Sequence, residues 1–342
     1  MTQGHMHRRA VLAGAAAVAM MRPAPGAATT DAIFGDVAKR AAALDQLHAL
    51  VVMERGKIRF SRAFRGPALD RTVNVKSVSK TILALTTGIA VARGVLPGPE
   101  ARLVDVAPAI VPRNATPSVQ EIRLSHLLTM TAGLQRTSGP YYGDWVASRN
   151  WTSYVLTRPQ VAAPGARFQY STGVFHVLGA AIASAAGRDL HALTQEWLAR
   201  PLGIEIPPWT RAPEGFFMGG NNMALSPLGL ARLGETVRNA GRLDGAAVIP
   251  ADWIETSWRA RTRSPFSGDD YGFGWFLTRL GGVDVAYGRG YGGQMLYVVP
   301  AAEAVIAVTS DPTRPARTRG HVGDLNRLVA TGILPALGAA GG

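Results

Sequence analysis

A serine and a lysine three residues apart have the residue types of an activated nucleophile. They are Ser77 and Lys80, in the run Ser77-Val78-Ser79-Lys80, and only four of the chain's 36 basic residues are lysines. A partly buried lysine can lose its proton and act as a base, whereas arginine stays charged. On a helix this spacing puts both side chains on one face, so that the amine can take the serine's proton. Such a pair also arises by chance, so on its own it leaves a purely structural role open.

Further motifs give this pair a context. Four segments follow one another along the chain, namely Asn74-Val75-Lys76-Ser77-Val78-Ser79-Lys80-Thr81, Ile122-Arg123-Leu124-Ser125-His126-Leu127-Leu128-Thr129-Met130-Thr131-Ala132-Gly133-Leu134, Phe168-Gln169-Tyr170-Ser171-Thr172-Gly173 and Gly288-Arg289-Gly290-Tyr291-Gly292-Gly293-Gln294. In order and spacing, over roughly residues 32–338, they resemble the motifs of class C β-lactamases and related penicillin-binding-protein-like serine hydrolases.

The resemblance implies roles for particular residues. Ser77 would attack a carbonyl to form an acyl-enzyme, and Lys80 and Tyr170 would share the proton transfers. Which of these two is the base for acylation stays open. The tyrosine, beside a lysine ammonium, would form its phenolate below its ordinary pKa of about 10. The backbone N–H groups of Ser77 and Tyr291 would form the oxyanion hole, and no cofactor is implied.

Departures from the family pattern bear on the substrate. Thr172 stands where the family has the asparagine of Tyr-Ser-Asn, and Gly288 and Arg289 stand where it has the lysine and threonine of Lys-Thr-Gly. With Gly290, these residues are expected to bind substrate. The lysine and threonine help the family to hold a carboxylate, so β-lactam recognition is not implied here. The run from Gly290 to Gln294 is closer to the esterase and 6-aminohexanoate-oligomer hydrolase branch.

Aromatic residues and histidines are further candidates for the site. Trp145 and Trp151, with two nearby tyrosines, could line an apolar acyl pocket or pack beneath a long loop. His126 and His176 lie in apolar helical patterns, which favours core positions. His321 begins the last predicted helix and could approach the cleft.

The sequence thus predicts a serine hydrolase that cleaves a small ester or amide. A β-lactamase or D-alanyl-D-alanine peptidase is an alternative, because these enzymes would use the same machinery on a different substrate. A non-catalytic penicillin-binding or sensor protein is a second alternative. The presence of Ser77, Lys80 and Tyr170 together argues against the latter, since a degraded site usually loses one of its members.

Composition excludes several other classes. The chain of 342 residues is 47% hydrophobic and 17% charged, which is typical of a globular protein, and it has no cysteine for disulfides or thiolate chemistry. The formal charge is +13, but the arginines are dispersed and no nucleic-acid-binding motif accompanies them. No spacing of histidines and acids predicts a metal site. The expected partner is a small ester, amide or β-lactam substrate, and the oligomeric state is left open.

Residues 1–28 are typical of an export signal. Arg8 and Arg9 precede the apolar run 10–21, which is too short to span a membrane, and small residues at 26–28 offer a cleavage site. The paired arginines resemble a twin-arginine signal, although Val11 stands where such signals usually have phenylalanine. We therefore expect a periplasmic or secreted protein, with no stable membrane span once the signal is removed.

The elements needed to position these residues can be predicted from periodicity and turn residues. Helices are expected at 31–45, 80–93, 126–131 (capped by Ser125), 174–186, 190–199, 227–241 and 322–337. Strands are expected at 48–53, 57–64, 271–280 (with Trp275 in the core), 283–287, 292–299 and 304–310. The fold class is then α/β (α+β), a β-lactamase-like fold with one antiparallel sheet built from both ends of the chain. The α/β lobe would span about 29–75 and 245–342, with a helical lobe at about 95–240 inserted in it.

Overall fold

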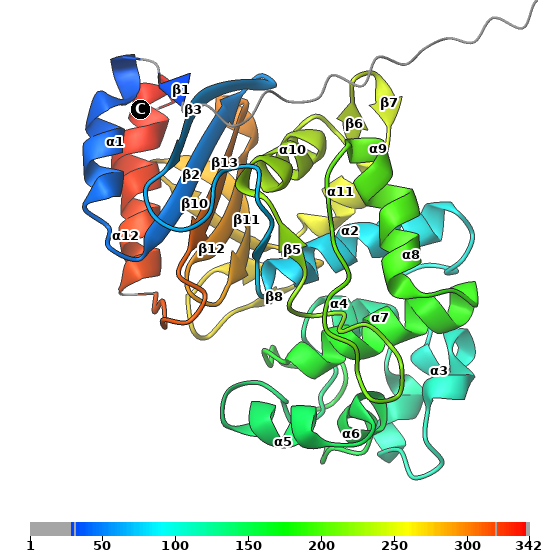
Figure 1. Ribbon diagram of the computed structural model, residues 1–342. Helices are drawn as coiled ribbons and strands as arrows, with labels where there is room; N and C mark the ends of the chain where they lie inside the picture. Colours follow the sequence, from blue (N-terminus) through cyan, green and yellow to red (C-terminus); the bar gives the residue numbers. More distant parts are fainter. Residues whose placement is uncertain (1–28, 31, 319, 340–342) are drawn as a thin grey trace, which may run out of the picture.

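The computed structural model of the chain describes residues 29–30, 32–318 and 320–339, so the predicted export signal at 1–28 lies outside it. Strands from both ends of this part form one antiparallel sheet (Figure 1). Its order is β1 (Thr29–Thr30), β3 (Lys57–Ala63), β2 (Leu47–Glu54), β13 (Ala304–Ser310), β12 (Gln294–Val299), β11 (Val283–Gly290), β10 (Phe276–Leu280), β9 (Asp270–Tyr271) and β8 (Thr262–Arg263). The predicted antiparallel sheet is confirmed.

The last strand in the sequence, β13, lies in the interior of the sheet, beside the middle strand β12. It pairs with β2 on one side, where Ile306 faces Val52, and with β12 on the other, where Ile306 faces Tyr297. Every residue of β12 and β13 is buried. Helices cover both faces of these strands, which explains why their sequences are almost continuously apolar and do not alternate.

Helices from distant parts of the chain form the covering layers. Figure 1 shows α1 (Gly35–Ala42) and α12 (His321–Leu328) side by side on one face of the sheet. On the other face, α10 (Pro227–Arg238) packs against β2, β12 and β13, and α2 (Val78–Ala92) packs against β11 and β12. Thus α10 packs on the sheet, although it falls in the range expected for the helical lobe.

A region built mainly of short helices lies on the far side of α2 (Figure 1). Its longest helix is α7 (Thr172–Ala186), which contacts α2, α4, α6 and α8 and ends at Gly187 in the left-handed conformation. The surrounding helices are α3 (Leu103–Val106), α4 (Leu124–Leu128), α5 (Tyr142–Ala147), α6 (Trp151–Leu156), α8 (Leu190–Thr194) and α9 (Arg200–Leu202). Because α2 lies between the sheet and this region, its first turn is placed at the junction of the two.

Smaller elements complete the described part. Two small two-stranded sheets are formed by β4 (Val73–Asn74) with β5 (Ala224–Leu225), and by β6 (Arg242–Leu243) with β7 (Ala246–Ala247). The remaining helices are α11 (Ala251–Ser257) and α13 (Leu334–Ala336). Within the residues described, no helix combines the length and apolarity needed to cross a bilayer.

Some expected elements differ from those observed. Ser125 is not an N-cap, because α4 begins at Leu124 and Arg123 takes that position. The expected strand 271–280 is interrupted, so Trp275 is buried in the core but lies in a bend between β9 and β10. The last helix is divided into α12 and α13 by a π-helical turn at Val329–Ile333. Apolar periodicity is the same on both sides of such a bend or turn, so it does not reveal these interruptions.

Candidate active site

Ser77 lies at the N-cap of α2, directly after a residue with a strained backbone. Lys76 has φ +51°, a left-handed conformation that is uncommon for residues other than glycine. The strain is held by hydrogen bonds, because the Lys76 N–H donates to Asn74 Oδ1 (2.8 Å) and the Ser79 hydroxyl donates to the Lys76 carbonyl. Ser79 Oγ in turn accepts from the Met223 N–H (3.0 Å). Strain of this kind, fixed by its surroundings, is typical of functional sites.

Lys80 is buried one helical turn after Ser77 and has three polar partners. Its Nζ lies 2.9 Å from Ser77 Oγ, 3.3 Å from Thr172 Oγ1 and 2.6 Å from the Gly220 carbonyl oxygen. Burial lowers the pKa of Lys80 well below 10.5. No ion pair with a described carboxylate opposes this lowering, for which burial is the cause.

Tyr170 lies beside the same amine. The Lys80 Nζ is 4.9 Å from the centroid of its ring. Burial raises the pKa of Tyr170 above 10.0, and this effect outweighs the opposing ones of a hydrogen bond with Ser77 and of the Arg289 charge. The expectation of a phenolate formed below the ordinary pKa of tyrosine is therefore not met in the free protein, because burial disfavours the charged form.

Ser77 and Tyr170 line a cleft of about 690 Å³, and Lys80 is buried behind them. Its walls include Ser77, Tyr170 and Thr172, and, from the sheet, Arg289 and Gly290. Three of the six residues expected to bind substrate line this cleft, namely Thr172, Arg289 and Gly290, and so does the expected oxyanion-hole residue Tyr291. No Asp or Glu is among the described residues that line it.

Arg289 reaches from β11 across the cleft wall to the loop after β13. Its guanidinium donates to Thr318 Oγ1 (3.1 Å) and to the Ala316 carbonyl (3.0 Å). The guanidinium therefore lies at the rim of the cleft, where it holds this loop. Its charge also opposes the rise in the pKa of Tyr170 that burial causes. These contacts show which way the Arg289 side chain points, which could not be predicted from the sequence.

The β11–β12 turn carries Tyr291 and is braced from behind. Gln294 Nε2 donates to the Ser310 carbonyl (2.7 Å), and the Ser310 N–H donates to Gln294 Oε1 (3.0 Å). Within the described chain no hydrogen bond uses the N–H of Ser77 or Tyr291, so both groups are free to donate to a ligand. His321 lies behind this turn, 2.9 Å from Ser310 Oγ, and does not line the cleft.

Gly288 is not a substrate-binding residue, contrary to expectation. It is buried on β11 and is absent from the cleft wall. A Cβ atom at this position would lie 2.6 Å from Thr81 Oγ1, so a side chain here would require Thr81 or the strand to shift. The strand thus approaches α2 closely, and the family's carboxylate-binding cation has no equivalent at position 288.

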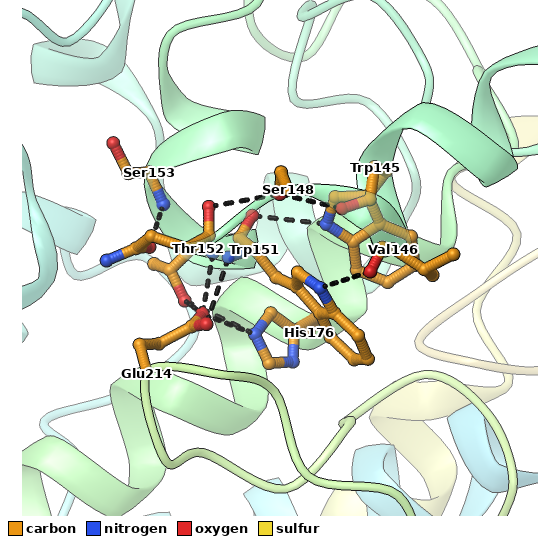
Figure 2. A network of polar contacts seen from close by, with 9 residues as sticks. Trp145, Val146, Ser148, Trp151, Thr152, Ser153, His176 and Glu214 are labelled. Carbon is orange, nitrogen blue, oxygen red and sulfur yellow. Dashed lines mark hydrogen bonds and ion pairs between the residues drawn. The ribbon is translucent and has the colours of Figure 1, made fainter.

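Trp145 and Trp151 also do not line the cleft, so the packing alternative for them is correct. Figure 2 shows their indoles in contact within a buried network, with ring centroids 5.2 Å apart and planes tilted by 51°. The indole N–H of Trp145 donates to the Trp151 carbonyl, and that of Trp151 donates to the Val146 carbonyl (both 3.1 Å). Trp145 also contacts the ring of Tyr142, which does line the cleft. The tryptophans therefore support the wall from behind.

His176 is a buried core residue, as expected, and its partner is Glu214 (Figure 2). Its Nε2 lies 3.2 Å from Glu214 Oε1, and the same carboxylate accepts from the N–H groups of Trp151 and Thr152 at 3.0 and 2.8 Å. Burial would raise the pKa of Glu214, but these hydrogen bonds lower it to about 2. His126, in turn, accepts from the Arg123 N–H and lies outside the cleft wall.

Some residues of the site were not anticipated from the sequence. Lys76, Ser138, Asn221 and Asn222 line the cleft, and Gly220 supplies the carbonyl partner of Lys80. The run Gly219-Gly220-Asn221-Asn222 is a turn signal, but nothing in it indicates contact with a segment 140 residues earlier. Among the described residues, no three His, Cys, Asp or Glu side chains gather as metal ligands.

Comparison with known proteins agrees with this geometry. A family model described as Beta-lactamase matches residues 40–331. The chain belongs to this family. The chain is 30% identical to esterase EstB of Burkholderia gladioli over 211 residues. This aligned region covers 56% of this chain and 53% of the esterase.

Further relatives differ in the activities named for them. Over 156 residues the chain is 28% identical to the D-alanyl-D-alanine-carboxypeptidase/endopeptidase AmpH of Escherichia coli K12, covering 43% of this chain and 39% of AmpH. The matches thus span about half or less of these relatives. A penicillin-binding protein homologue from Caulobacter crescentus has the same fold, with a TM-score of 0.70 at 17% identity, covering 90% of this chain and 98% of that one.

Proposed function

We propose that this protein is a serine hydrolase that cleaves a carboxylic ester or amide through an acyl-enzyme on Ser77. The observation that carries the proposal is the 2.9 Å contact between Ser77 Oγ and the Nζ of the buried Lys80. A serine hydroxyl needs an adjacent base to become a nucleophile, and Lys80 has both the position and the lowered pKa. The named activities of the relatives, esterase and carboxypeptidase, are of the same reaction type.

Lys80 is the base for acylation in this mechanism. A neutral amine has two N–H groups and one lone pair. The Gly220 carbonyl and Thr172 Oγ1 accept the two N–H groups, which turns the lone pair toward the Ser77 hydroxyl. Tyr170 is less suited to this role, because its pKa is raised.

Tyr170 serves instead in proton transfer to the leaving group. Lys80 becomes an ammonium when it takes the serine's proton, and Tyr170 lies beside it. The tyrosine hydroxyl can give its proton to the departing oxygen or nitrogen and be reprotonated from Lys80. In deacylation, water attacks the ester carbonyl, its proton goes to Lys80, and Ser77 regains a proton as it leaves.

The backbone N–H groups of Ser77 and Tyr291 stabilise the oxyanion in this proposal. Both residues line the cleft, and neither N–H has another acceptor in the described chain. Loss of one such donor typically costs about 3–4 kcal/mol of transition-state stabilisation. The buried bracing of the turn by Gln294 and Ser310 holds the Tyr291 donor in place before the charge develops.

Labelling of the nucleophile tests the proposal. A fluorophosphonate probe should label the wild type and not Ser77→Ala. Ser267→Ala is the matched control, because it removes another hydroxyl from the cleft wall, and it should be labelled like the wild type. Equal labelling of Ser77→Ala and the wild type would exclude Ser77 as the nucleophile.

A substrate screen separates the alternatives. We expect hydrolysis of p-nitrophenyl esters and slow or no turnover of a chromogenic cephalosporin, because the cation at position 288 is missing. Fast cephalosporin turnover without ester hydrolysis would instead favour a β-lactamase or D-alanyl-D-alanine peptidase. Inertness toward esters, amides and β-lactams would revive the non-catalytic alternative.

A further inference from the structure

A second cavity adjoins the cleft at Tyr170. Its volume is about 530 Å³, and its wall shares Tyr170 and Phe266 with the cleft. Three arginines lie in this wall, namely Arg136, Arg167 and Arg263, and we therefore call it the arginine cavity. The two cavities therefore meet at these shared residues.

The charged groups of the arginine cavity are all hydrogen-bond donors. None of its three arginines forms an ion pair with a described residue, and no Asp or Glu lines its described wall. Gln135, also in the wall, accepts at its Oε1 from Arg158, which leaves its amide N–H groups to donate. With the Gln169 amide oriented to satisfy its neighbours, Arg167 Nη2 lies 2.9 Å from its oxygen.

The rims of both cavities are apolar. Within the described chain, large hydrophobic side chains are exposed at five positions, and three of these border the two cavities: Val161 (41% exposed), Phe266 (61%) and Tyr291 (53%). Exposed apolar side chains that gather at a cavity favour contact with a ligand. The complement of this surface is an apolar chain that ends in an anion.

We propose that the substrate carries a carboxylate on an apolar chain and that Arg136 and Arg167 bind this carboxylate while the scissile carbonyl lies at Ser77. The inference rests on the proposed function and adds a substrate class to it. Guanidinium groups bind carboxylates through paired, charge-assisted hydrogen bonds. Phe266 and Val161 pack along the chain between the two ends.

Matched substrates test this directly. The mono-p-nitrophenyl ester of adipate is compared with p-nitrophenyl hexanoate, which has the same number of acyl carbons and no charge. A second pair carries the carboxylate on the other side of the scissile bond, as the hexanoate esters of 4-hydroxybenzoate and 4-hydroxybenzamide. We expect kcat/KM to favour the charged member of one pair by about tenfold or more, the factor that one charge-assisted hydrogen bond gives. The pair that responds shows which half of the substrate enters the arginine cavity.

Variants assign the preference to the cavity. Arg136→Gln/Arg167→Gln should abolish the charged-to-neutral ratio through a rise in KM for the charged ester. Arg136→Glu/Arg167→Glu should reverse it in favour of the 6-trimethylammoniohexanoate ester, a gain that misfolding cannot produce. Arg62→Gln, on the exposed side of β3, is the matched control and should keep the wild-type ratio.

Other outcomes have distinct meanings. If the neutral and charged esters are hydrolysed equally, or if the double variants keep the wild-type ratio, the carboxylate proposal is wrong while the proposed function stands. If Ser77→Ala hydrolyses all of these esters as fast as the wild type, the proposed function itself fails.

Discussion

Lys80 combines a charge and a removable proton, and substitution can separate the two. Arginine keeps the charge but cannot act as a base near neutral pH. We expect Lys80→Arg to lower kcat/KM for p-nitrophenyl esters by about 10²–10⁴-fold, the usual contribution of a general base. Circular dichroism should show a folded protein. Lys57→Arg is the control, since it makes the same exchange at an exposed position. Substantial activity in Lys80→Arg would exclude Lys80 as the base.

The pH dependence distinguishes Lys80 from Tyr170 as the base. The active form has a neutral lysine, so kcat/KM rises with pH through the pKa of Lys80. Burial has lowered this pKa, so the rise should lie well below pH 10.5. A tyrosine base would give a rise above pH 10, because the pKa of Tyr170 is raised. The profile should be measured with a neutral ester, whose own charge does not change.

At the residue scale, the sequence predicted the candidate reacting groups better than their surroundings. Ser77, Lys80 and Tyr170 were identified from short motifs and lie close together, with Ser77 and Tyr170 in the cleft wall. The Gly220 carbonyl that orients Lys80 was not predictable, because a backbone acceptor has no residue type of its own. For the same reason the tryptophans at 145 and 151 remained ambiguous between cleft and core until their neighbours were known.

At the scale of elements, the close approach of β11 to α2 can be tested by a double-mutant cycle. Gly288→Ala should lower the free energy of unfolding by about 1–3 kcal/mol, because its Cβ would overlap Thr81 Oγ1. Thr81→Ala removes that oxygen, so in its background Gly288→Ala should cost much less. Denaturant unfolding measures all four proteins. Additive costs would mean that Thr81 is not the obstacle.

Glu214 ties the loop after α9 to α6, and its contribution depends on pH. Its pKa is about 2 in the folded protein and near 4.5 when unfolded, so the ionised form is stabilised by folding. This stability is fully present above about pH 5 and is lost as the pH falls toward 2. We expect Glu214→Gln to be less stable by about 1–3 kcal/mol at pH 7, with the difference shrinking below pH 4. Thermal unfolding across this range checks it, and a constant difference would contradict it.

Element boundaries were predicted well where caps are explicit and poorly where tertiary contacts decide them. Gly187 closes α7 and Ser226 caps α10, as expected from their residue types. The strand around Trp275 was predicted as continuous, yet Gly274 there has φ +75° and its backbone bends toward α2. The need for that bend comes from packing, which is absent from local sequence.

At the scale of the molecule, the cleft and the arginine cavity together form a basic surface. Their described walls contain Lys76, Arg136, Arg167, Arg263 and Arg289 and no acid. Raising ionic strength from about 0.02 to 0.5 M shortens the screening length severalfold. We expect kcat/KM for the adipate half-ester to fall severalfold over this range, while that for the hexanoate ester stays nearly constant. Parallel behaviour of the two esters would indicate that charge does not guide the substrate.

The architecture followed from the order of predicted strands and helices, but the neighbours within the sheet did not. A sequence with strands at both ends indicates a shared sheet, which is observed. That β13 lies between β2 and β12 depends on pairing across more than 240 residues, for which local patterns carry no information. Export remains a proposal, and comparing the mass of the protein from the medium or periplasm with that of the full chain would test cleavage near residue 28.

The position of β13 between β2 and β12 has a consequence for the synthesis of the chain. On the ribosome, the β2–β3 hairpin is complete at Ala63, whereas the strand that β2 pairs with begins at Ala304. At roughly 5–20 residues per second, about 10–50 s of translation separate the two. During that time the apolar edge of β2 has no partner and is open to pairing with other chains. Protection of this edge from other chains therefore depends on the emergence of β13.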